Sequence, residues 1–245
     1  LQNCKFIVKN EDLYIEAYNL PVYTLATEEL EFDFKFAYQT KMINYFFFIS
    51  IIFQVISAVI VMNKEFNIKH NDLHIGNIMF TKTERKYLYY RCEHKFFMVP
   101  TFGYLVKIID WGRCTYDYNN IKCFNSVFKF NGECYNQYRE DKLGSKKQNI
   151  LPSDNRWSDL VIFSHNLLFN CPEYIDSPIG IFLKKIIKAK DGTLDIDSFS
   201  WDTYLNISNN TFNVKPKILL KNNIFKEYLV KKNDIDNQVI YDLNY

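Results

Sequence analysis

The chain has 245 residues, of which 48% are hydrophobic and 24% are charged, as in ordinary globular proteins. This composition excludes a wholly disordered chain, a collagen-like repeat and a polytopic membrane protein. Lysine and arginine number 30 against 28 aspartates and glutamates, an excess too small to predict nucleic-acid binding. The six cysteines form no C-x-x-C pair, which favours reduced thiols in a cytoplasmic protein over a disulfide framework.

The first predicted elements are two short strands and a long apolar helix. Residues 5–8 and 13–17 are largely apolar runs separated by a polar turn, which predicts a hairpin. Residues 45–62 contain no charge and reach the lower length limit for a membrane span. Because Gln54 interrupts this run and Lys64 follows it, we predict a buried helix at the centre of a helical lobe, and no membrane span.

Beyond this helix the chain alternates between strands, loops and shorter helices. Residues 78–80 and 105–109 are strand-like, and the aromatic stretch between them reads as an extended hairpin. Residues 113–155 are polar and aromatic, which predicts a long irregular loop with a functional role. Helical periodicity at 157–169 and 179–189 predicts two further helices.

Two polar segments carry the chemistry: HNDLHIGN at residues 70–77 and IDWG at residues 109–112. Phosphoryl transfer requires a carboxylate beside the acceptor hydroxyl and oxygen ligands for the magnesium that bridges the phosphates. Magnesium takes few protein ligands, usually one or two carboxylate or amide oxygens. This pattern therefore indicates that Asp72 orients a hydroxyl while Asn77 and Asp110 hold the metal.

The two segments resemble the catalytic loop H-R-D-L-x-x-x-N and the metal motif D-F-G of the eukaryotic-type protein kinase superfamily. The first motif is matched at His70, Asp72, Leu73 and Asn77, and the second at Asp110 and Gly112. The resemblance implies an α+β fold, with a mainly helical large lobe, a hinge and a remnant of the small-lobe β-sheet. It also implies ATP and Mg²⁺ as cofactors, a Ser or Thr hydroxyl on a protein as acceptor, and Asp72 as the catalytic residue.

The resemblance extends to segments outside the two motifs. The strand that contains Glu16, with Tyr18 after it, resembles the hinge that binds adenine, so it implies nucleotide-binding roles for both residues. Asp159, at the start of an apolar helix, resembles the aspartate that anchors the catalytic loop. The resemblance gives Asp159, His70 and Gly112 supporting structural roles.

These matches cover nearly the whole chain and predict one kinase-like domain over residues 1–245. Within it we expect the strand remnant and hinge at 1–20, the helical lobe at 21–245 and an activation-loop-like segment at 113–155. The Gly-rich loop and the strand lysine of the family are absent ahead of the hinge. We therefore expect a sequence truncated at its N-terminus, with a degenerate pseudokinase or scaffold as the alternative.

The identity of the phosphate acceptor is also open, because His74 occupies the position where Ser/Thr protein kinases usually have lysine. The pattern H-x-D-L-H-x-G-N is also similar to aminoglycoside and choline kinases, which phosphorylate small molecules. In either case His74 is a candidate for contact with substrate or phosphate.

Asn71 replaces the arginine that, in many kinases, pairs with a phosphate on the activation loop. An amide cannot make the bidentate contact of a guanidinium with phosphate. We predict that the activity does not depend on phosphorylation of residues 113–155. Rates of the full-length protein with and without phosphate on this segment test the prediction, and a large gain on phosphorylation contradicts it.

Overall fold

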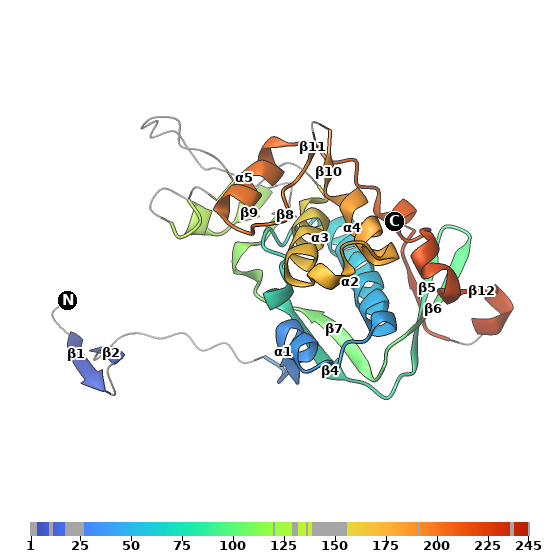
Figure 1. The fold of residues 1–245 in the computed structure, drawn as a ribbon, viewed down its shortest axis with the longest axis horizontal. Helices are drawn as coiled ribbons and strands as arrows, with labels where there is room; N and C mark the ends of the chain where they lie inside the picture. Colours follow the sequence, from blue (N-terminus) through green and yellow to red (C-terminus); the bar gives the residue numbers. More distant parts are fainter. Residues whose placement is uncertain are drawn as a thin grey trace.

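Helices and short sheets alternate along the chain in the computed structural model, which describes residues 4–9, 12–17, 27–119, 121–128, 132–135, 137–138, 156–190, 192–235 and 238–244 (Figure 1). The helices are α1 (Phe34–Gln39), α2 (Tyr45–Glu65), α3 (Ser158–Asn170), α4 (Pro178–Ile186), α5 (Trp201–Asn209) and α6 (Pro216–Leu219). The strands are β1 (Cys4–Lys9), β2 (Asp12–Ala17), β3 (Phe32–Asp33), β4 (Ile78–Lys82), β5 (Tyr87–Cys92), β6 (Lys95–Pro100), β7 (Tyr104–Ile108), β8 (Thr115–Tyr118), β9 (Ile121–Phe124), β10 (Lys188–Ala189), β11 (Gly192–Thr193), β12 (Leu229–Val230) and β13 (Ile240–Asp242). This content is mixed α and β with small sheets, which agrees with the predicted α+β class.

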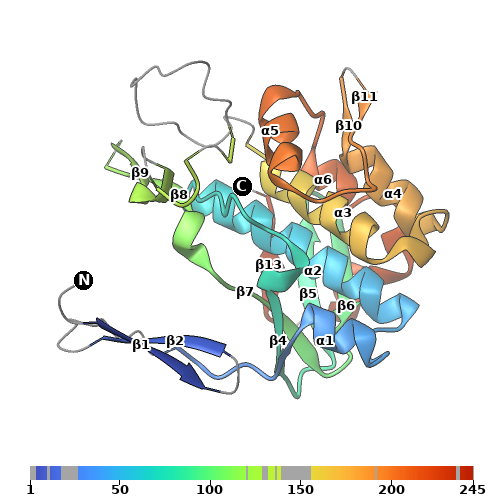
Figure 2. The same cartoon turned by 60° about the vertical axis from the view of Figure 1, so that its left-hand side comes forward.

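Helix α2 forms the centre of the core, as the uncharged run predicts. Asn44 caps its N-terminus by accepting a hydrogen bond from the Phe47 N–H at 2.9 Å. It is apolar and long enough to cross a membrane, but 72% of its most apolar stretch is buried inside the protein. Gln54 accepts from the Val106 N–H at 3.0 Å and so ties the helix to β7. In Figure 2, α2 runs between α3 and the strands, the position of a core helix.

The pairing of strands β4 and β7 brings the two polar motifs side by side. They pair antiparallel, with Ile78 opposite Ile108, and β3 extends the same sheet beside β4. The ladder continues one step further, because the Ile109 N–H donates to the Asn77 carbonyl at 3.0 Å. The end of the first motif therefore lies directly beside the start of the second.

The predicted aromatic hairpin is present as β5 and β6, but it belongs to a larger sheet. Strand β12 pairs antiparallel with β6, and β13 pairs parallel with β5, so that the order is β12-β6-β5-β13. The outer strands hold two and three residues. Strands so short contain too few positions for an alternating pattern to be recognised in the sequence.

One predicted boundary is wrong, and one predicted loop is only partly irregular where the structure describes it, since residues 139–155 lie outside the described residues. The helix expected over 179–189 ends at Ile186, because Lys188 and Ala189 pair with β11 in a small hairpin. The loop expected over 113–155 is not wholly irregular, since Thr115–Tyr118 pairs with Ile121–Phe124. The predicted N-terminal hairpin is confirmed as β1 and β2, with Cys4 opposite Ala17.

Candidate active site

The loop that carries Asp72 is anchored by a buried carboxylate. Asp159, at the start of α3, accepts the backbone N–H groups of His70 and Asn71, each at 2.8 Å. Burial raises the pKa of the Asp159 carboxyl, while the electrostatic interaction with His70 and these N–H donors oppose that shift. The His70 ring Nε2 lies 2.8 Å from the Ile109 carbonyl. The loop is thereby joined both to α3 and to the strand end that precedes Asp110.

Asp72 itself is almost fully buried, and both of its carboxylate oxygens have partners. Arg113 Nη1 lies 3.0 Å from one oxygen, and the Tyr204 hydroxyl donates to the other. Burial and the neighbouring Asp72 charge raise the pKa of the Tyr204 phenol, so it stays protonated and donates. Arg113 also pairs with Glu133 at 3.0 Å, and its guanidinium lies 5.8 Å from the ring centre of Trp201.

The sequence reasoning missed both partners of Asp72. Arg113 directly follows the metal motif, so its place in the chain was a usable signal. Tyr204 lies on α5, 132 residues away from Asp72, and no local pattern connects them.

Replacing Tyr204 by Phe should lower the free energy of unfolding by about 1.5–3 kcal/mol, because a hydrogen bond to a charged group is lost. Urea denaturation of the variant and the wild type measures the difference. Tyr118→Phe is the matched control, since Tyr118 is exposed and should change stability by less than about 0.5 kcal/mol. Equal effects of the two variants would show that the Tyr204–Asp72 bond contributes nothing to stability.

His74 lies against Asp72 as a neutral ring. Burial lowers the pKa of His74, although the Asp72 charge acts in the opposite direction. Nδ1 accepts the Gly76 N–H at 3.0 Å, which places the proton of the neutral ring on Nε2, 3.7 Å from an Asp72 oxygen. A Cβ at position 76 would lie 2.8 Å from the His74 ring, so glycine is required for this contact.

Asn77 and Asp110 lie at adjoining ends of β4 and β7. The Asn77 side-chain Nδ2 donates to the Asp72 carbonyl at 2.8 Å, which leaves its Oδ1 outside that bond. Asp110 is exposed, and the ion pairs among the described residues do not include it; its Oδ1 accepts the Gly112 N–H at 3.4 Å. Its backbone is left-handed, with φ of 61°, an uncommon conformation for a residue other than glycine.

These two side chains fit the ligand requirement of magnesium. An amide oxygen and an exposed carboxylate are the hard donors that magnesium takes, with its other positions filled by phosphate and water. Among the described residues no group of three or more His, Cys, Asp or Glu could hold a metal, so the donor set does not suit a zinc site. A Cβ at position 112 would lie 3.2 Å from Asp110 Oδ1. A glycine here therefore avoids a close contact with that carboxylate.

The structure gives little information on the two predicted nucleotide-binding residues. Glu16 lies on β2 opposite Lys5, and Tyr18 is outside the described residues. Their predicted contact with adenine therefore stays a prediction.

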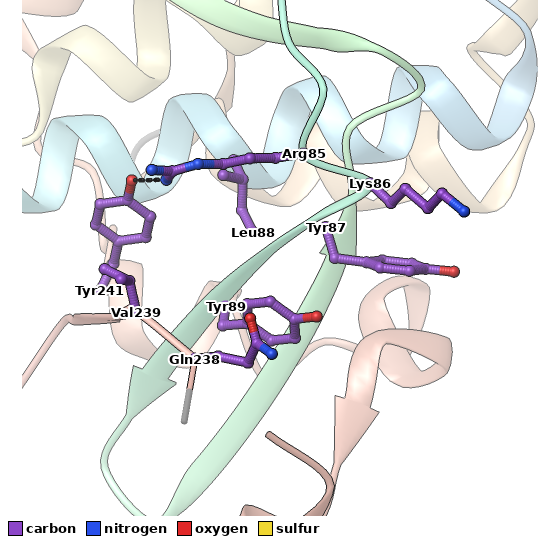
Figure 3. Close-up of a pocket in the computed structure, with 8 residues that line it drawn as sticks. All are labelled: Arg85, Lys86, Tyr87, Leu88, Tyr89, Gln238, Val239 and Tyr241. Carbon is purple, nitrogen blue, oxygen red and sulfur yellow. Dashed lines mark hydrogen bonds between the residues drawn. The ribbon is translucent and has the colours of Figure 1, made fainter. Parts of the chain in front are cut away.

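A separate hollow of about 350 Å³ lies at the start of β5, between the residues that lead into β5 and those that lead into β13 (Figure 3). In it the Arg85 guanidinium donates to the Tyr241 hydroxyl at 3.1 Å. The hollow shares no residue with the cluster around Asp72, and the figure shows Lys86 and Tyr87 directed away from that hydrogen bond. We assign it no part in the chemistry.

Comparison with known proteins gives partial similarity to one kind of kinase. No family model matches the chain. Bovine (Bos taurus) serine/threonine-protein kinase haspin is 30% identical over 104 residues, which is 41% of this chain and 13% of that protein. Mouse (Mus musculus) haspin is 37% identical over 62 residues, which is 25% of this chain and 8% of that protein. The chain thus matches only a small fraction of the length of these relatives, and part of it is similar to a serine/threonine-protein kinase.

Proposed function

We propose that this chain contains the catalytic and metal-binding segments of a protein-kinase-like phosphotransferase. In this proposal it uses ATP and Mg²⁺ and phosphorylates Ser or Thr hydroxyls on proteins. The observation that carries it is the buried Asp72, held on a loop anchored by Asp159, with Asn77 and Asp110 at the adjoining strand ends. The partial similarity to haspin supports the same class of reaction.

Each residue has a defined part in the proposed reaction. Asp72 orients the acceptor hydroxyl and accepts its proton while the hydroxyl oxygen bonds to the terminal phosphorus of ATP, the bond from that phosphorus to the bridging oxygen breaks, and ADP leaves. Asn77 Oδ1 and an oxygen of Asp110 would hold magnesium, which when bound neutralises the charge that develops on the phosphates. Asp159 keeps the loop backbone in place through its two N–H acceptor contacts. His74, a neutral donor beside Asp72, is proposed to contact the substrate or a phosphate oxygen.

A catalytically impaired scaffold is the second candidate, and one observation favours it. Both oxygens of Asp72 already have partners, in Arg113 and Tyr204. An acceptor hydroxyl must displace or share one of these bonds before Asp72 can accept a proton. A scaffold has no such requirement.

Titration with ATP and magnesium is expected to raise the thermal unfolding midpoint of the full-length protein. A ligand at about 100 times its Kd adds about 2.7 kcal/mol to the free energy of unfolding. Asp110→Ala should remove the part of the shift that requires magnesium, while Asp197→Ala, an exposed site elsewhere, should retain it. No shift in the full-length protein would favour the scaffold.

A positive shift then allows the acceptor to be identified. Peptides that contain Ser or Thr are expected to be phosphorylated, whereas aminoglycosides and choline are not. Transfer only to the small molecules would overturn the protein-kinase proposal and favour the small-molecule alternative.

We also propose a cytoplasmic location. Cys92, Cys114, Cys123, Cys134 and Cys171 are all free thiols. Free thiols are typical of a reducing compartment.

A further inference from the structure

The side chain of Arg113 reaches from the metal motif to the catalytic loop. Arg113 ends the single helical turn Trp111–Arg113, and Asp110 caps the start of that turn. Its Nη1 lies 3.0 Å from a carboxylate oxygen of Asp72. Arg113 therefore connects the segment that carries a proposed metal ligand with the proposed base.

The guanidinium of Arg113 is held in one orientation by three groups. Nη1 pairs with Asp72, Nη2 donates to Glu133 at 3.0 Å, and the ring centre of Trp201 lies 5.8 Å from the guanidinium carbon. The backbone is fixed as well, because the Arg113 carbonyl accepts from Asn71 Nδ2 at 2.8 Å. An arginine held in this way loses little conformational freedom when it binds a further group.

Arg113 keeps donor groups for a ligand. A guanidinium has five N–H donors, and the contacts with Asp72 and Glu133, its ion-pair partners in the described part of the chain, engage one nitrogen each. The side chain is 22% exposed, so a ligand can reach it from solvent. Its partial burial strengthens the attraction of its charge for an anion.

Glu133 is the weaker of the two carboxylate partners of Arg113. Its side chain is 72% exposed, whereas that of Asp72 is 7% exposed. Water screens an exposed ion pair, so such a pair contributes little free energy. A phosphate oxygen that reaches Arg113 can therefore replace Glu133 while the contact with Asp72 is kept.

We propose that Arg113 is a further catalytic residue, which binds an oxygen of the terminal phosphate of ATP beside Asp72. Phosphoryl transfer requires positive charge at the transferred group, and an arginine of the same chain can supply it. The planar fork of a guanidinium also matches the geometry of phosphate oxygens. This inference rests on the proposed function, because it names a residue that acts on the ATP of that reaction.

Arg113 forms no covalent bond in the proposed step. The acceptor oxygen bonds to the terminal phosphorus, the bond from that phosphorus to the bridging oxygen breaks, and ADP leaves, while the hydroxyl proton passes to Asp72. Arg113 keeps its contact with the transferred group throughout, so it stabilises the negative charge on the phosphate oxygens.

Nucleotide binding is the first measurement, because it requires no turnover. Isothermal titration calorimetry of the full-length protein, without acceptor, gives its affinities for MgATP and MgADP. In Arg113→Gln we expect MgATP to bind at least about tenfold more weakly, because a hydrogen bond between charged groups is lost, and MgADP to bind as in the wild type. Equal losses for the two nucleotides, or no loss, would overturn the role of Arg113.

Arg91→Gln is the matched control, because Arg91 is an exposed arginine on β5 that pairs with Asp242. It should bind both nucleotides as the wild type does. Arg113→Lys is a second variant, for use if Arg113→Gln does not fold. An ammonium group lacks the planar fork, so MgATP should bind at least about threefold more weakly with MgADP unchanged. Wild-type affinity for MgATP in Arg113→Lys would then count against the proposal.

Transfer rates separate a catalytic role of Arg113 from an inhibitory one. Single-turnover transfer to a Ser- or Thr-containing peptide should be slower in Arg113→Gln by about 10²–10³, the usual effect of removing one donor to a developing negative charge. A faster rate would show that the ion pair with Asp72 inhibits the base, which would overturn the proposal.

The two measurements together distinguish failure of this inference from failure of the proposed function. Transfer by the wild type, with unchanged nucleotide affinities in Arg113→Gln, removes only the role of Arg113. A selective loss of MgATP affinity in Arg113→Gln, without transfer by the wild type, removes the proposed reaction and retains Arg113 as a residue that binds the terminal phosphate. A full-length protein that binds neither nucleotide contradicts both.

Discussion

Replacing Asp72 by Asn is expected to lower the rate of phosphoryl transfer by about 10²–10⁴, the usual contribution of a positioned general base. The amide keeps the size of the side chain and can still accept from Tyr204, but it cannot take a proton from the acceptor. Single-turnover transfer to a Ser- or Thr-containing peptide by the full-length protein, with magnesium and ATP in excess, measures the chemical step.

Asp202→Asn is the matched control for this variant. Asp202 is exposed in the first turn of α5, the helix that also carries Tyr204, so its substitution tests for an effect of lost charge alone. Its rate should equal that of the wild type. Unchanged turnover in Asp72→Asn, with nucleotide affinity also unchanged, would remove the catalytic assignment.

Replacing Asp159 by Ala is expected to give the largest loss of stability. The substitution leaves the N–H groups of His70 and Asn71 buried without an acceptor. Each unsatisfied buried group costs about 1–3 kcal/mol, so the two together cost about 2–6 kcal/mol. Since whole domains are stable by only about 5–15 kcal/mol, urea denaturation will show a large shift of the midpoint.

Asp176→Ala provides the comparison, because the Asp176 side chain is 97% exposed and pairs with a surface lysine at 3.4 Å. Surface pairs of this kind contribute about 0–1 kcal/mol. If Asp159→Ala costs no more than Asp176→Ala, then Asp159 does not anchor the loop. Asp159→Asn, which keeps one acceptor oxygen, should fall between the two.

Much of the site could be predicted because its signals are local in the sequence. Asp72 and Asn77 lie five positions apart on one loop, and Asp110 follows an apolar run that is recognisable as a strand. The core helix was equally recognisable, since an uncharged run of that length is apolar on most of its surface and so is stable where most of that surface is covered.

Other predictions failed where short strands pair, because strands of two to four residues leave no recognisable pattern in the sequence. The helix predicted to continue through Lys188 ends at Ile186, because Lys188 and Ala189 form a two-residue strand that pairs with β11. Thr115–Tyr118 and Ile121–Phe124 form a hairpin through backbone hydrogen bonds to each other, within a segment whose composition indicated only a loop.

By itself the sequence determined the chemical character of this protein: an apolar core helix, a carboxylate loop and a second carboxylate after the next long hairpin. Only the tertiary structure decided what surrounds those groups. The Tyr204 hydroxyl donates to Asp72 across 132 positions of the chain. Such contacts arise when packing of the core brings distant segments of the chain together. A local sequence pattern does not show which distant residues will become neighbours.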